Sequence, residues 1–205
     1  MKKAKSYLAN IVFSDEHIAS INDHSTNRMW VQQNGGRVLT RERKRVNNVD
    51  HVLVWAAIGV GYKGPMIIFP KEEIDHETGR HKAFRLTAKT YIRRCLSKIA
   101  PAVRGRVYMH DGATAHTAHN VQNYVLGKGF EVLQNWPPYS PDLNPIEEVW
   151  AELNRRVSNR HPTTHEELVH YVKQEWDGMP QSLIDSYCNS FRKKLKRCVE
   201  KKGQC

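Results

Sequence analysis

The sequence predicts a single α/β domain over residues 1–205, and three observations support this fold class. Short runs of strand-forming residues alternate with stretches of helical periodicity. Apolar residues make up 40% and charged residues 26% of the chain, a composition typical of globular rather than disordered proteins. A chain of 205 residues is long enough for one hydrophobic core and short for two.

Strands are predicted where apolar and β-branched residues cluster between turn signals. The run HVLVWAAIGV (51–60) is separated from PMIIF (65–69) by the turn-forming GYKG. The other predicted strands are YLANIVF (7–13), RMWVQQ (28–33), RVYMH (106–110) and FEVL (130–133).

Helices are predicted over residues 87–99, over roughly 114–126, and over almost all of the chain from Asn144 onward. Thr87 can cap the first helix, and breaks are expected near 160–164 and at Pro180, with Thr164 and Glu167 spaced as in a capping box. The apolar face of the first helix contains Tyr91, Cys95, Leu96 and Ile99. This order fits a ribonuclease H-like fold, with a mixed five-stranded sheet flanked by helices and extra C-terminal helices. Other α/β folds share the pattern.

The charge balance points to nucleic acid as the first partner to consider. The chain has 32 Lys and Arg against 21 Asp and Glu, a formal net charge of +11. Such a field attracts polyanions, although a merely soluble basic protein or one that binds anionic membrane would look the same. No apolar run approaches the ~18–20 residues needed to cross a bilayer, so no membrane association is expected. The lysine-rich start soon meets Asp15 and Glu16, unlike a signal peptide.

A basic segment, GGRVLTRERKRV (35–46), follows a Gly-Gly turn between predicted strands. A solvated hairpin and a contact with a DNA backbone or a partner subunit are equally good interpretations of this segment. The residues that would make the contact are Arg37, Arg41, Arg43, Lys44 and Arg45.

Two aspartates stand out by their position. Asp15 follows the apolar run that ends at Phe13, and Asp111 directly follows RVYMH. Sites in α/β sheets gather at the carboxyl ends of strands. Either aspartate alone could be a turn or capping residue, but their shared placement favours a site.

Glu147 lies on a predicted helix that begins after Asn144, with Pro145 at its first position. At ~100° per residue, the apolar stripe of this helix leaves Glu147 at its edge and directs Glu148 toward water. The stripe contains Ile146, Val149, Trp150, Leu153 and Val157. Glu147 could face a site at the sheet edge, or it could bond the Asn144 amide in a capping box, and the spacing does not decide between the two.

Three segments resemble the signature blocks of mariner-type transposases. They are FSDE (13–16), HDGATAHTAHNV (110–121) and WPPYSPDLNPIEEVWAELNRRV (136–157), and residues 49–69 resemble the central strands of the family. The likeness therefore covers nearly the whole chain. It departs from the commoner pattern in the 35 residues between Asp111 and Glu147, one more than in many relatives, and in Gly112 and Ala113 after Asp111.

The resemblance implies that Asp15, Asp111 and Glu147 form an Asp-Asp-Glu catalytic triad that binds two Mg²⁺ ions, with Mn²⁺ able to substitute. Two hard cations roughly 3.5–4 Å apart activate the attacking oxygen and stabilise the leaving oxygen at phosphorus. The implied reaction cleaves transposon-end phosphodiesters and joins the 3′-hydroxyl to target DNA at TA sites. The implied full-length protein is a nuclear homodimer. The helix-turn-helix modules of the family are expected to be absent, because only 14 residues precede Asp15.

Two alternatives remain open at this stage. One is a catalytically inactive or domesticated DNA-binding or dimerisation module derived from a transposase. The other is a ribonuclease H-like nuclease that acts on RNA–DNA hybrids.

Further side chains near these blocks are weaker candidates. His116 is expected to orient substrate phosphate or Asp111, with core packing as the alternative, and Tyr139 and Ser140 are candidates for DNA contact. His116 and His119 form an HxxH pattern, but no matching Cys or Glu pair supports a zinc site.

Overall fold

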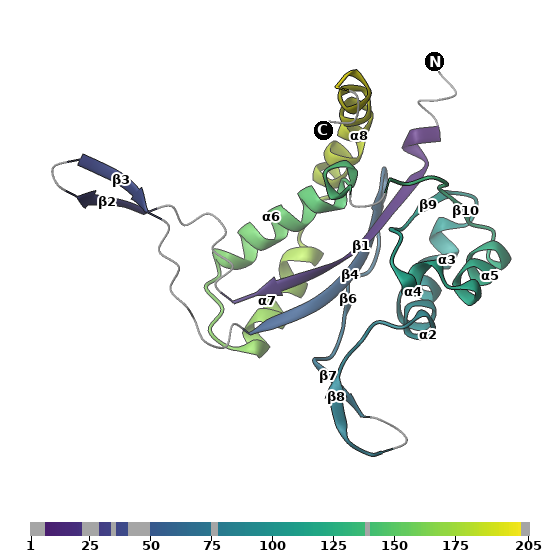
Figure 1. The fold of residues 1–205 in the computed structure, drawn as a ribbon, viewed down its shortest axis with the longest axis horizontal. Helices are drawn as coiled ribbons and strands as arrows, with labels where there is room; N and C mark the ends of the chain where they lie inside the picture. Colours follow the sequence, from purple (N-terminus) through teal and green to yellow (C-terminus); the bar gives the residue numbers. More distant parts are fainter. Residues whose placement is uncertain are drawn as a thin grey trace.

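The computed structural model describes residues 7–21, 29–33, 36–40, 50–74, 78–137 and 140–201. At its centre is a mixed sheet with the strand order β10-β9-β1-β4-β5, and β6 pairs with β4 beside this path (Figure 1). The sheet strands are β1 (Ile11–Ser20), β4 (His51–Gly59), β5 (Tyr62–Lys63), β6 (Ile67–Ile68), β9 (Val107–Met109) and β10 (Glu131–Val132). The five-stranded path agrees with the prediction, and β6 adds a sixth strand.

Two small hairpins lie outside this sheet. The strands β2 (Met29–Gln33) and β3 (Gly36–Thr40) pair with each other, as do β7 (Glu72–Ile74) and β8 (His81–Ala83). Figure 1 shows both hairpins projecting away from the central sheet.

The first strand differs from the prediction at both ends. Residues 7–9 form a short helical turn, and β1 begins at Ile11 and continues to Ser20. It continues because β4 pairs with it along its whole length, from Val12 opposite Gly59 to Ser20 opposite His51. Asp15 therefore lies in the middle of a strand and not just beyond its end, as the sequence had suggested.

Helices cover both faces of the sheet (Figure 1). One layer consists of α2 (Ala88–Tyr91), the π-helical turn η1 (Ile92–Leu96), α3 (Ser97–Val103), α4 (Thr114–Thr117) and α5 (His119–Gly127). The other consists of α6 (Ile146–Ser158), α7 (His165–Asp177) and α8 (Gln181–Glu200), preceded by the 3₁₀ turn η2 (Pro141–Leu143). No helix among the described residues is long and apolar enough to span a membrane.

Alternation along the strands divides the core into two parts. Ile11 and Phe13 pack with α6, α7 and α8, whereas Val12 between them packs with the α2–α5 layer. Each fully buried side chain of this size stabilises the fold by about 1.5–3 kcal/mol. Neighbouring residues of β1 therefore point into different layers, which determines the surroundings of the site described below.

Most predicted helices are confirmed, with local differences. The apolar faces expected over 87–99 and 146–157 are buried, but the first helix contains the π-helical turn and the helix expected over 114–126 is interrupted at Ala118. Thr164 caps α7 by accepting from the Glu167 amide at 3.2 Å, while the Glu167 carboxylate accepts from the Thr163 amide at 2.8 Å and not from Thr164. The capping box is thus only half formed.

Candidate active site

Asp15 and Asp111 are brought together by the pairing of two parallel strands. Phe13 of β1 is in register with Met109 of β9, so each aspartate lies two residues beyond a paired position. Both line one cleft of about 340 Å³. The other residues that line it are Gly112, Ala113, Trp136, Pro137, Ser140, Pro141 and Asn144.

Asp15 is half-buried in the middle of β1, opposite Ala56 of β4. Its Oδ1 accepts a hydrogen bond from the Glu16 amide at 2.8 Å, and its Oδ2 accepts one from Asn144 Nδ2 at 3.3 Å. Asn144 thereby connects the strand to the start of α6, where its Oδ1 also accepts from the Ile146 amide at 3.3 Å.

Glu147 lies in the first turn of α6, close enough to Asp15 for its charge to raise the pKa of that carboxyl group. The capping-box alternative is not realised, because the Asn144 amide donates to the Pro141 carbonyl at 3.0 Å. The helix begins at Ile146, with Pro145 and not Asn144 in the cap position. Glu147 is half-buried near Asp15, and its place in a catalytic site remains a prediction.

Glu148 behaves differently from the expectation that it faces water. Its Oε2 lies 3.3 Å from Lys194 Nζ and 3.4 Å from Ser190 Oγ, both on α8. The prediction failed because α8 packs beside α6 on this side. Glu148 thus contacts the last helix, whereas Glu147 lies near Asp15.

Asp111 is held by its own loop. Its Oδ1 accepts hydrogen bonds from the Ala113 amide at 3.0 Å and from His116 Nδ1 at 2.6 Å. The hydrogen bond from His116 holds the pKa of Asp111 below its ordinary value. Asp111 is therefore ionised over the whole range in which the protein would work.

The other two carboxyl groups have raised pKa values. Burial, together with the nearby charges of Glu16, Glu147 and Asp111, raises the pKa of Asp15 to about 7. Burial also raises the pKa of Glu147. A carboxyl group such as Asp15, whose pKa is raised by neighbouring negative charges, lies where positive charge is stabilised.

His116 bridges two carboxylates and is itself buried, with 2% of its side chain exposed. Its Nδ1 bonds Asp111, and its Nε2 lies 3.1 Å from Glu16 Oε1. Burial alone would lower the pKa of His116, but the hydrogen bonds to Asp111 and Glu16 outweigh it and raise the pKa to about 9. Because carboxylates occupy both ring nitrogens, this imidazole is not arranged as a zinc ligand.

Glu16 is the residue that sequence reasoning missed. Strand alternation directs Asp15 toward α6 and Glu16 toward the α2–α5 layer, where His116 lies. The signal was available in the adjacent Asp-Glu pair, but it could be interpreted only with the knowledge that β1 continues past Phe13.

Carboxylates are the oxygen ligands that Mg²⁺ and Mn²⁺ prefer, and the raised pKa of Asp15 indicates negative charge without full compensation. In their present positions, however, no three His, Cys, Asp or Glu side chains within the described ranges could hold one ion together. Asp15 is bonded to Asn144, while Asp111 is bonded to His116. The donor types fit a hard divalent cation, and a side-chain rearrangement would have to accompany its binding.

The weaker candidates have different outcomes. Ser140 lines the cleft beside Asp15 and Asp111. Arg41, Arg43, Lys44, Arg45 and Tyr139 lie outside the described residues, and Arg37 belongs to β3, of which only the backbone is described. Their role in DNA contact remains a prediction.

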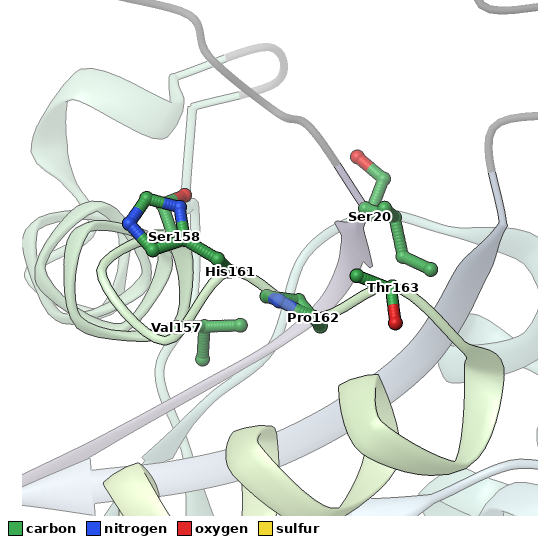
Figure 2. Close-up of a pocket in the computed structure, with 7 residues that line it drawn as sticks. Ser20, Val157, Ser158, His161, Pro162 and Thr163 are labelled. Carbon is green, nitrogen blue, oxygen red and sulfur yellow. The ribbon is translucent and has the colours of Figure 1, made fainter.

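A second cavity, of about 300 Å³, lies between the end of β1 and the loop that joins α6 to α7. Figure 2 shows Ser20 opposite Pro162 and Thr163, with Val157 and Ser158 of α6 at its other side. It is lined by Ser20, Ile21, Val157, Ser158, His161, Pro162 and Thr163. Without a carboxylate in its lining it offers none of the chemistry of the first cleft.

Comparison with a protein-family model shows that residues 10–169 match the DDE superfamily endonucleases. Among curated proteins, the chain is 29% identical over 100 residues to the Tc1 transposase of Caenorhabditis elegans, covering 49% of this chain and 36% of that protein. It is 31% identical over 98 residues to the Tc3 transposase of the same organism, covering 47% and 30%. The matches thus span about a third of the length of these relatives.

Solved structures of the Mos1 mariner transposase share the fold. A paired-end complex with the left transposon end superimposes with a TM-score of 0.75 at 17% identity, covering 98% of this chain and 58% of that chain. The Mos1 catalytic domain superimposes with a TM-score of 0.69 at 16% identity, covering 99% and 87%. The predicted ribonuclease H-like architecture is therefore confirmed.

Proposed function

Because the chain belongs to the DDE superfamily of endonucleases, we propose that it is the catalytic domain of a Tc1/mariner-type DNA transposase. The observation that carries this proposal is the cleft in which Asp15 and Asp111 meet. Glu147, at the start of α6, lies near enough to raise the pKa of Asp15. The proposed reaction is cleavage of a phosphodiester at a transposon end, followed by attack of the freed 3′-hydroxyl on target DNA.

We propose that Asp15, Asp111 and Glu147 bind two divalent cations, Mg²⁺ or Mn²⁺. Such ions would stabilise the attacking and the leaving oxygen of an in-line displacement. The solved Mos1 structures include complexes with Mg and with Mn, which supports the choice of metal. The residues of the chain would keep Asp15 and Asp111 together where β1 and β9 pair, orient Asp111 through His116, and contribute Glu147 from α6.

DNA is the proposed partner. The net charge of +11 supports it, and the Mos1 structures include paired-end and strand-transfer complexes. The family resemblance further supports integration at TA sites, a homodimeric full-length protein and a nuclear location, and we propose these for the whole protein.

The first test measures Mn²⁺ binding by electron paramagnetic resonance and Mn²⁺-dependent nicking of supercoiled DNA. We expect the wild type to bind Mn²⁺ and to nick, and Glu147→Gln to lose nicking by at least about a hundredfold, as expected for loss of a charged group that acts on the transition state. Glu148→Gln is the matched control, because its side chain contacts α8 and should leave nicking unchanged.

Other outcomes would replace the proposal. DNA binding without Mn²⁺ binding or nicking in the wild type would indicate an inactive module derived from a transposase. Selective cleavage of RNA–DNA hybrids would indicate a ribonuclease. Joining of pre-cut element ends to a target plasmid would extend the test to strand transfer.

A further inference from the structure

The two helical layers that cover the sheet differ in net charge. Residues 78–130, which include β8 and the α2–α5 layer, contain ten Lys and Arg and one acidic residue, Asp111. Residues 146–200, which include α6, α7 and α8, contain nine Lys and Arg and nine Asp and Glu. Figure 1 shows these layers on opposite sides of the sheet, so the excess of positive over negative charge lies on the side of the α2–α5 layer.

The basic layer presents exposed cations that no carboxylate neutralises. We call five of them the basic face; within the described part of the chain none of the five forms an ion pair. They are Arg85, Lys89, Arg93, Lys98 and Arg104. By contrast, in the part of the opposite layer formed by α6 and α7 and the loop between them, the exposed Arg155, Arg160 and Lys173 each pair with a neighbouring carboxylate.

The basic face adjoins the carboxylate cleft. Tyr91 lies between Lys89 and Arg93 in the chain, and its ring centroid is 4.2 Å from that of His116. His116 in turn bonds Asp111 at 2.6 Å. The segment that carries Lys89 and Arg93 is therefore connected to Asp111 through two side chains, those of Tyr91 and His116.

The surface chemistry of this layer favours nucleic acid over a lipid surface. Binding to an anionic membrane by a basic helix requires a second, apolar face that enters the lipid. Among the described residues of the α2–α5 layer, the exposed large hydrophobic side chain is Leu126, far along the chain from the basic face. Cations without an apolar partner surface are typical of contacts with phosphates.

We propose that the basic face binds the phosphate backbone of DNA and directs the duplex across the α2–α5 layer into the carboxylate cleft. That the polyanion is DNA rests on the proposed function, whereas its placement on the α2–α5 layer rests on the charge difference between the two layers. Contacts of this kind are independent of sequence, and each releases counterions, so they are measured by the salt dependence of binding.

The test compares two triple variants of the full 205-residue chain that lose the same charge. Arg85→Gln/Lys89→Gln/Arg93→Gln removes three cations of the basic face, and Arg155→Gln/Arg160→Gln/Lys173→Gln removes three from the opposite layer. The slope of log K against log salt is negative, and its magnitude decreases by roughly 0.9 for each phosphate that the protein no longer neutralises. We expect the first variant to reduce the magnitude of this slope by about 2–3 and the control to reduce it by less than about 1.

An equal change in both variants would overturn the proposal, because it would show that only net charge matters. Tighter binding to anionic phosphatidylserine vesicles than to duplex DNA, abolished in the first variant, would assign the face to membranes and also overturn it. Asp111→Asn separates the two proposals: it should abolish nicking and leave the salt slope unchanged. If the wild type does not nick but the slopes differ as expected, the proposed function fails and the DNA surface stands.

Discussion

His116 Nδ1 lies 2.6 Å from Asp111 Oδ1, and this hydrogen bond joins a buried imidazole to a half-exposed carboxylate. The opposite ring nitrogen bonds Glu16, so the ring cannot turn without breaking a hydrogen bond. Outer groups that orient a metal-binding carboxylate in this way typically change metal affinity or activity 10- to 100-fold when they are removed.

We therefore expect His116→Gln and His116→Asn to differ. The Asn amide nitrogen occupies the place of Nδ1 and can still donate to Asp111, whereas the Gln amide occupies the place of Nε2 and reaches Glu16. His116→Asn should lower Mn²⁺ affinity by less than about tenfold, and His116→Gln by about 10- to 100-fold. Titration calorimetry with Mn²⁺ measures both, and equal affinities in the two variants would contradict an orienting role for the hydrogen bond to Asp111.

The parts of the fold that could be predicted are those specified by local pattern. The apolar spacing of α6 placed Ile146, Val149 and Trp150 in the core, and all are buried. Along α8, Phe191 is buried, whereas Val199, eight residues later on the same helix face, is 77% exposed. Periodicity reports which residues share a helix face, but it does not report how far the rest of the protein extends beside that face.

That Asp15 and Asp111 lie in one cleft could be predicted from the sequence, but the hydrogen bonds that hold them could not. Asp15 and Asp111 were found because each follows an apolar run, although the reason given for Asp15 was wrong. The continuation of β1 through polar residues depends on β4, a partner that lies far along the chain. The role of Glu16 follows from that continuation, and so no local pattern around Glu16 could indicate it.

The pH dependence of stability in the metal-free chain follows from Asp15. Its pKa rises from an ordinary 3.8 to about 7 on folding, so the folded state prefers its protonated form. The stabilisation is present at low pH and is lost as the pH rises from about 4 to about 7. Urea unfolding in EDTA should therefore give a lower free energy of unfolding at pH 7.5 than at pH 5, and Asp15→Asn should remove most of that difference.

His116 adds a second, higher window. Its pKa rises from 6.5 to about 9 on folding, so the stabilisation from its charged form is complete below about 6.5 and is lost as the pH rises toward 9. Stability that fell between pH 7 and 9 in the wild type but not in His116→Asn would agree with this assignment. A flat profile from pH 5 to 9 in the metal-free wild type would contradict both assignments.

Lys63, on β5, hydrogen-bonds backbone carbonyl groups at the C-terminal end of α7. Its Nζ donates to the carbonyls of Trp176, Asp177 and Met179 at 3.0, 2.9 and 2.8 Å. A positive charge at a helix C-terminus is favourable, and hydrogen bonds from a charged donor contribute roughly 1.5–3 kcal/mol. We expect Lys63→Met to lower the free energy of unfolding by about 1.5–3 kcal/mol in urea titrations.

The control for this prediction is Lys173→Met on the same helix. Lys173 forms an exposed ion pair with Asp177 at 3.0 Å, a type of interaction that contributes about 0–1 kcal/mol. If the two substitutions had equal effects, the three carbonyl hydrogen bonds of Lys63 would carry no special weight.

A chain of buried hydroxyl groups lies beneath the carboxylate site. Tyr108 Oη lies 2.5 Å from Tyr91 Oη and 2.7 Å from Ser14 Oγ, and Ser14 also donates to the Met109 carbonyl at 3.1 Å. Tyr108→Phe leaves the buried Tyr91 hydroxyl without its partner, which should cost roughly 1–3 kcal/mol of unfolding free energy. Adding Tyr91→Phe removes that unpaired group, so the double variant should be less destabilised than the sum of the single variants by at least about 0.5 kcal/mol. A double-mutant cycle in urea measures this coupling, and strict additivity would show that the hydroxyl chain does not act as a unit.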